Sequence, residues 1–83
     1  MGTESRMVTM IRSICECLVD NYDEIKISEI EGDSTRIIEV RVAKEDTGKV
    51  IGRQGKTAEA IRTIVSAASG KDKKKTNFQI IDR

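Results

Sequence analysis

The sequence of 83 residues contains no histidine and no tryptophan, and Tyr22 and Phe78 are its only aromatic residues. Without histidine, general acid–base catalysis would fall to carboxylates or lysines, and no catalytic set of these is apparent in the sequence. Two aromatic side chains are also too few for the stacking platforms on which many nucleic-acid-binding domains hold bases. We therefore expect a binding protein rather than an enzyme, and one that does not depend on aromatic stacking.

Cysteine is equally scarce. Cys15 and Cys17 are the two cysteines of the chain, and on a helix their side chains would point about 200° apart. Such a pair makes neither a disulfide framework nor a complete zinc site. We expect no metal and no cofactor, and we expect both thiols to be buried or half-buried packing residues.

Long hydrophobic runs are missing as well. No stretch approaches the roughly 18 apolar residues of a membrane span, and the first residues lack the basic and apolar regions of a secretory signal. We therefore expect a cytoplasmic protein with no membrane partner. A length of 83 residues, 37% of them apolar, allows one small core, so we expect a single domain over residues 1–83.

Charge of one sign is not in excess, because 15 basic residues are balanced by 14 acidic ones. The charges are nevertheless unevenly spread, with a net charge of −3 over residues 1–44 and +4 over residues 45–83. A polyanion should therefore meet the second half of the chain.

The hydrophobic pattern predicts six elements in the order αββααβ. Thr3 or Ser5 is the expected N-cap of the first helix, and Gly70 is the expected end of the last one, before a solvated loop over residues 71–75. The first two strands should form an antiparallel hairpin around Gly32, and the third strand can join in parallel through a crossover. This is an α+β fold, a three-stranded mixed sheet with helices packed on one face. The expected helices cover residues 5–21, 45–51 and 56–69, and the expected strands cover residues 24–31, 36–43 and 77–80.

The most informative segment lies between the second and third expected helices. Gly52 and Gly55 stand three residues apart there, and glycines let another backbone come close and permit unusual backbone dihedrals. The turn leads into a helix N-terminus, whose free N–H groups and dipole favour an anion. Arg53 and Lys56 add positive charge beside it, and Lys49 lies one helical turn earlier. The segment therefore predicts contact with a phosphate-bearing ligand.

Three other interpretations compete. A plain connection between two helices, capped by glycines, would need no ligand, and a DNA-binding helix-turn-helix usually has longer helices than residues 45–51 provide. Gly55-Lys56-Thr57 is similar to the end of a Walker phosphate loop, but that pattern needs a glycine five residues before Gly55, where Val50 stands. The basic residues and the order of the elements favour nucleic-acid binding.

The pattern V-I-G-x-x-G-x-x-x-x-A-I-R, from Val50 to Arg62, resembles the KH nucleic-acid-binding domain. The order of helices and strands resembles the type II form of that domain. A chain of this length with one such domain is similar to the bacterial single-KH-domain family called KhpA. The resemblance spans nearly the whole chain and is most specific between Glu45 and Arg62.

The resemblance implies an RNA chaperone or adaptor that holds about four unpaired nucleotides of single-stranded RNA on the G-x-x-G loop and in an adjacent groove. Gly52 and Gly55 would admit the sugar-phosphate backbone. Arg53 would neutralise a phosphate, and Gln54 would donate a hydrogen bond. The residues assigned to RNA binding in this way are Lys49, Val50, Ile51, Gly52, Arg53, Gln54, Gly55, Lys56 and Arg41.

The same resemblance implies a groove with two walls. Val50 or Ile51 would line its helix side, and Val40, Arg41 and Val42 are the candidates for its strand side. It further implies a homodimer, or a heterodimer with a second KH-containing protein. Pairing would supply a second site to a domain whose few phosphate contacts give it weak affinity for RNA.

A second function is compatible with these residues, namely a KH-like protein-interaction or dimerisation module with little affinity for nucleic acid. The near-zero net charge and the few aromatic residues favour it. The same residues suit single-stranded DNA as well as RNA, because the distinction rests on contacts to the 2′-hydroxyl.

Overall fold

The computed structural model describes residues 5–82, with Asp72 described by its backbone alone. Within that range, three α-helices and three strands follow one another in the order αββααβ, which confirms the α+β fold class. Short 3₁₀ turns stand at Tyr22–Glu24, Lys44–Asp46 and Arg53–Gly55. The helices are α1 (Arg6–Leu18), α2 (Thr47–Ile51) and α3 (Lys56–Asp72), and the strands are β1 (Lys26–Glu31), β2 (Thr35–Arg41) and β3 (Lys75–Ile80).

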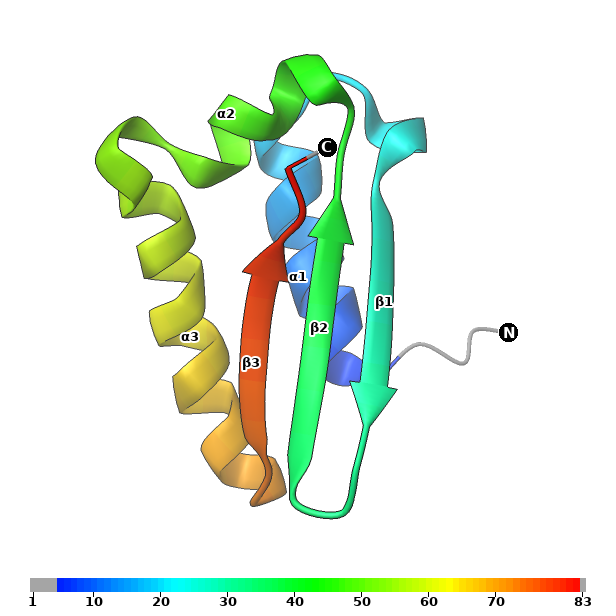
Figure 1. The fold of residues 1–83 in the computed structure, drawn as a ribbon, viewed down its shortest axis with the longest axis vertical. Coiled ribbons are helices and arrows are strands. Elements are labelled where there is room, and N and C mark those ends of the chain that lie inside the picture. Colours follow the sequence, from blue (N-terminus) through cyan, green and yellow to red (C-terminus); the bar gives the residue numbers. More distant parts are fainter. Residues whose placement is uncertain (1–4, 83) are drawn as a thin grey trace.

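The central strand of the sheet is β2, which runs antiparallel to β1 and parallel to β3. In this register Ile37 of β2 lies opposite Ile30 on one side and Asn77 on the other. The connection from β2 to β3 passes through α2 and α3, which is the crossover that the sequence predicts. Figure 1 shows α1 behind the sheet and α3 beside β3, so one face of the sheet carries the helices and the other is uncovered.

Alternation along β2 decides which face of the sheet is buried. Arg36, Ile38 and Val40 are buried on the helix side, whereas Ile37 and Glu39 are only partly buried on the uncovered face. The buried face meets the apolar stripes of α1 and α3. The core consists of Met7, Val8, Ile11, Cys15, Val19, Ile25, Ile38, Val40, Val42, Val50, Ile61, Val65 and Phe78.

The first helix begins as the sequence predicts. Ser5 is its N-cap, and the Ser5 hydroxyl accepts a hydrogen bond from the Val8 N–H at 3.2 Å; the alternative cap, Thr3, lies outside the described residues. The prediction for the cysteines holds for one of the two, because Cys15 is buried and Cys17 is exposed. No helix in residues 5–82 is long and apolar enough to cross a membrane.

The last helix ends later than the sequence predicts. α3 continues through Gly70 for two further residues, and Lys73 takes the left-handed conformation that ends it, with φ of 59°. Lys75 already belongs to β3 and donates its N–H to the Ser34 carbonyl at 3.1 Å. Residues 71–75 therefore do not form the expected solvated loop, because the end of α3 and the start of β3 take up most of them.

Candidate nucleic-acid interface

The G-x-x-G segment, residues 52–55, forms a tight corner between α2 and α3 and is referred to below as the corner loop. Three of its residues have a positive φ, namely Gly52 at 80°, Gln54 at 56° and Gly55 at 74°. Two backbone hydrogen bonds close the corner, from Gly52 N–H to the Gly48 carbonyl at 2.8 Å and from Gly55 N–H to the Gly52 carbonyl at 3.1 Å. The loop is thus a defined turn whose backbone geometry is set by its glycines.

The two glycines of the corner loop have different surroundings. A Cβ atom added at Gly52 would lie 2.1 Å from Thr57 Oγ1 and 2.8 Å from the Thr57 backbone nitrogen. A Cβ atom added at Gly55 would meet nothing within 4 Å. Gly52 is therefore required by the packing of the corner loop against α3, whereas Gly55 leaves open space that a ligand backbone can approach.

The polar side chains at the corner loop lie in solvent. Arg53 and Gln54 are exposed, and so is Lys56 at the start of α3. Among the residues that the structure describes, no ion pair involves Arg53 or Lys56. The N-cap of α3 is Gly55, which offers no side-chain hydrogen bond to the first turn. The N-terminus of α3 and two cations therefore form a positively polarised edge.

The apolar residues assigned to the groove are mostly in the core. Val50 is 0% exposed, and on the strand side Val40 and Val42 are 0% and 9% exposed. Ile51 is half-buried at the end of α2. Of these four residues, Ile51 has the most surface to offer a ligand.

Arg41 lies on the uncovered face of the sheet. It is exposed and stands opposite Lys26 of β1. Successive side chains of a strand point to opposite faces, so Arg41 points away from the helix layer that carries the corner loop. The structure therefore does not bring Arg41 together with Arg53 and Lys56.

The amine of Lys49 is engaged within the protein. Its Nζ lies 2.9 Å from Asp46 Oδ1 and 2.6 Å from Asp20 Oδ2. Asp46 is fully buried, and its Oδ2 accepts hydrogen bonds from the backbone N–H of Asn21 at 3.0 Å and from the Asn21 side-chain amide at 2.9 Å. The bond from Lys49, together with those from the Asn21 segment, holds the pKa of Asp46 well below its usual range although burial opposes this. The hydrogen bonds to Asp20 and Asp46 in turn raise the pKa of Lys49.

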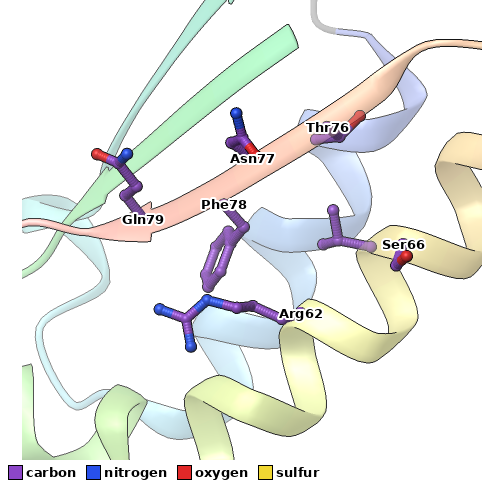
Figure 2. A pocket seen from close by; sticks show the side chains of 7 residues that line it. Arg62, Ser66, Thr76, Asn77, Phe78 and Gln79 are labelled. Atoms are coloured by element: carbon purple, nitrogen blue, oxygen red, sulfur yellow. The ribbon is translucent and has the colours of Figure 1, made fainter. Parts of the chain in front are cut away.

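A hollow of about 450 Å³ lies between α3 and β3 and is referred to below as the α3–β3 hollow. Figure 2 shows Arg62 and Ser66 of α3 on one side and Thr76 and Phe78 of β3 on the other, with the side chains of Arg62 and Phe78 pointing toward one another. Arg62 follows Lys56 by six residues, which is about 9 Å along the helix axis. The hollow therefore lies along the same helix that starts at the corner loop. Its lining is completed by Val65, Asn77 and Gln79.

The strand of this hollow was missed by the sequence analysis, which considered β2 rather than β3. The signal lay in the crossover itself, because the helices of a β–α–β connection pack back onto the sheet that the next strand joins. A smaller hollow of about 210 Å³ lies between α1 and α3 and is lined by Arg6, Met7, Met10, Ala68 and Lys71. Within residues 5–82, no three cysteine, aspartate or glutamate side chains gather as metal ligands would.

Comparison with known proteins gives consistent matches. The family model described as "KhpA/KhpB, KH domain" matches residues 8–80. The RNA-binding protein KhpA of Caldanaerobacter subterraneus subsp. tengcongensis is 49% identical over 75 residues, covering 90% of this chain and 100% of that protein. The RNA-binding protein KhpA of Clostridium acetobutylicum is 45% identical over 75 residues, with coverage of 90% and 100%. The RNA-binding protein KhpA of Bacillus subtilis is 44% identical over 80 residues, with coverage of 96% and 99%. The comparison with solved structures found no significant match.

The matched region begins within α1 and ends with the last residue of β3, so it contains the sheet, the corner loop and the α3–β3 hollow. Identity of 44–49% over nearly the full length of these relatives leaves the shared ancestry in no doubt. The chain belongs to the KhpA/KhpB KH-domain family.

Proposed function

We propose that this protein binds single-stranded RNA, holding about four unpaired nucleotides against the corner loop and along the α3–β3 hollow. The observation that carries the proposal is the corner loop, where the open space at Gly55 is flanked by the exposed cations Arg53 and Lys56. The printed names of the three relatives, each an RNA-binding protein KhpA, support RNA as the class of ligand.

The phosphate contacts belong to the corner loop. A phosphate placed beside Gly55 meets the N-terminus of α3, whose dipole and free N–H groups favour negative charge. Arg53 supplies a charge-assisted hydrogen bond to that phosphate, and Lys56 neutralises the charge of the adjacent phosphate. The exposed Gln54 donates a further hydrogen bond from its side-chain amide. The missing side chain at Gly55 lets the sugar-phosphate backbone come close.

The bases belong in the α3–β3 hollow. Val65 and Phe78 are 1% and 4% exposed, so they form an apolar floor and offer no ring face for stacking. Arg62 and Ser66 are exposed on α3, and β3 is an edge strand with one side of its backbone outside the sheet. These groups suit hydrogen bonding to base edges, and Ile51 adds an apolar contact at the end of α2. Recognition by edges rather than by stacking fits a chain with two aromatic residues.

A single copy should bind weakly. The two cations that meet phosphates, Arg53 and Lys56, would give a shallow salt dependence, with a slope of about −1.4 for single-stranded RNA. We therefore propose that a partner supplies a second RNA site, and that this partner is either another copy of this chain or a second KH-containing protein. Ile64 is 47% exposed on α3 and offers apolar surface for such pairing. We propose that the protein acts in the cytoplasm as an RNA chaperone or adaptor.

Pairing without RNA binding is the second candidate function, and the exposed Ile64 is the observation that favours it. Size-exclusion chromatography with light scattering, run with and without a short single-stranded RNA, separates the two. A tight dimer with no measurable affinity for RNA would establish the second candidate in place of the first.

The experiment that tests RNA binding replaces Arg53 and Gln54 together by Asp. The matched control replaces Arg41 and Thr35 by Asp, which changes the net charge equally at two exposed positions of β2. Each variant is crosslinked by ultraviolet light to a short single-stranded RNA of mixed sequence, and circular dichroism checks its fold. We expect the corner-loop variant to lose crosslinking and the control to keep it.

Retained crosslinking in a folded corner-loop variant would refute the proposal. Equal loss in both variants would contradict an interface confined to the corner loop and would include Arg41 in it. A single-stranded DNA of the same sequence, measured in parallel, decides between RNA and DNA, because only RNA offers a 2′-hydroxyl.

A further inference from the structure

The position of the corner loop depends on what holds α2. That helix has five residues, too few to be stable on its own. One anchor is Val50, which is 0% exposed in the core. The other is polar and consists of Asp20, Asn21, Asp46 and Lys49, which we name the Asp46 network.

Asp46 stands at the N-cap position of α2, yet its carboxylate does not cap that helix. An aspartate at this position usually accepts hydrogen bonds from the first helical turn. Here Oδ2 accepts both hydrogen bonds from Asn21, and Oδ1 accepts the one from Lys49. The buried carboxylate thus joins the segment between α1 and β1 to the start of α2 and, through Lys49, to its middle.

Lys49 directs its charge to carboxylates of the protein. Its amine lies between Asp46 and the exposed Asp20 at the distances given above. A phosphate that drew this amine away would leave the carboxylate of Asp46 buried without its cation, which is a costly arrangement. Two carboxylates around one ammonium also leave the neighbourhood negative, which disfavours a phosphate there.

We propose that Lys49 is a positioning residue for RNA binding, which contacts no phosphate and fixes α2 and the corner loop through Asp46. The proposal rests on the proposed function and replaces the role in direct RNA contact that the sequence pattern gave to Lys49. Arg53 and Lys56 are then the cations of the corner-loop region that meet phosphates.

The salt dependence of RNA binding separates a positioning lysine from a contacting one. For a single strand, each lost phosphate contact flattens the slope of log affinity against log salt by about 0.7. The affinity of a short fluorescein-labelled, mixed-sequence RNA is measured over a salt series for the wild type and for Lys49→Met and Asp46→Asn. Lys56→Met is the matched control, because it removes the charge of an exposed lysine at the corner loop itself.

We expect Lys56→Met to flatten the slope by about 0.7. Lys49→Met and Asp46→Asn should each weaken RNA binding about tenfold and leave the salt slope at its wild-type value. The double variant should bind no more weakly than either single variant, because both changes break the same bond between Lys49 and Asp46. In the RNA-free protein, Lys49→Met should already shift the amide resonances of Gly52 and Gly55, as a displaced corner loop requires.

A flatter slope for Lys49→Met would overturn the proposal, and so would wild-type affinity in a folded Asp46→Asn or unmoved loop resonances in Lys49→Met. If circular dichroism shows that Asp46→Asn does not fold, the test rests on Lys49→Met. Its salt slope and its Gly52 and Gly55 amide resonances then decide whether Lys49 positions the loop or contacts RNA. Absence of RNA binding by the wild type at every salt concentration would refute the proposed function itself, so the two failures are distinguishable.

Discussion

The apolar core and the corner loop are held in place by different interactions. Ile11, Ile38 and Val65 in the core are 0%, 0% and 1% exposed, so burial of apolar surface stabilises that region. The corner loop has backbone at positive φ, follows a five-residue helix and depends on a buried carboxylate. The corner loop, to which we assign the phosphate contacts, is therefore the part of the interface whose position can change while the core stays folded.

The largest expected effect comes from the core. Ile38→Ala removes a fully buried side chain of the central strand and should lower the free energy of unfolding by about 2–5 kcal/mol. Urea denaturation measures this loss. RNA affinity, measured at a temperature where the variant is fully folded, should equal that of the wild type. Weaker affinity in the folded variant would show that core and corner loop are not separate.

The two loop glycines give the next effect and a matched pair. Gly52→Ala forces a side chain into a backbone region that glycine alone tolerates and onto Thr57, so it should cost on the order of 3 kcal/mol. In Gly55→Ala the new methyl group enters open space, so only the left-handed backbone is unfavourable, and the free energy of unfolding should fall by about 1 kcal/mol. Thermal unfolding compares them. Equal losses of stability would contradict the different surroundings assigned to these glycines.

Acid should act on the Asp46 network before it acts on apolar packing. The pKa of Asp46 is lower in the folded state than in the unfolded one, so its contribution is present above the ordinary carboxyl pKa of about 4 and is lost as the pH falls below that. Asp46→Asn should therefore flatten the fall of stability between about pH 4 and pH 2.

The control for this experiment is Glu31→Gln. Lys74 and, to a smaller extent, Arg36 lower the pKa of Glu31 too, but the Glu31 carboxylate is exposed at the far end of the sheet, and salt should screen it. Chemical denaturation over a pH series, at low and high salt, should show an Asp46 contribution that survives salt and a Glu31 contribution that does not. The same salt response for both would argue against a sheltered Asp46 network.

Thr76→Val should have a smaller effect with the opposite sign. Thr76 lines the α3–β3 hollow, and its hydroxyl oxygen is buried without a hydrogen-bond partner in the described structure. Replacing it by a methyl group of similar shape should raise the free energy of unfolding by about 1 kcal/mol. A decrease in stability would mean that the hydroxyl has a partner in solution.

The smallest effect concerns the two cysteines of α1. Burial raises the pKa of Cys15 to about 11, so its thiol stays protonated and unreactive near neutral pH. The exposed Cys17 should react with iodoacetamide in the native protein, and mass spectrometry should find Cys15 modified only after denaturation. Equal labelling of both would mean that the core opens around α1.

Much of the fold could be predicted from local patterns. The alternation of β2 and the turn at Gly32 predict the hairpin. The glycines Gly52 and Gly55, with basic residues beside them, locate the corner loop before any coordinates are known. The end of α3 could not be predicted in this way. Gly70 is a usual stop signal, but the helix continues until its chain can enter β3 at Lys75.

The candidate site was harder to predict because it depends on contacts distant in sequence. An aspartate before a short helix has the same local pattern whether it caps that helix or turns inward, and Asp46 turns toward Asn21, which is 25 residues away. Which strand lines the hollow depends on which strand occupies the edge of the sheet beside α3. Alternation places Arg41 on one of two faces of its strand, and only packing determines which face meets the helices.

A nuclear magnetic resonance titration of the wild type with a short single-stranded RNA shows which surface of the protein meets the ligand. We expect the largest amide shifts in residues 52–58 and 76–79, with little change at Lys26 and Arg41 on the uncovered sheet face. Shifts centred on that uncovered face, or no shifts at all at millimolar RNA, would contradict the central claim that the corner loop and the α3–β3 hollow bind RNA.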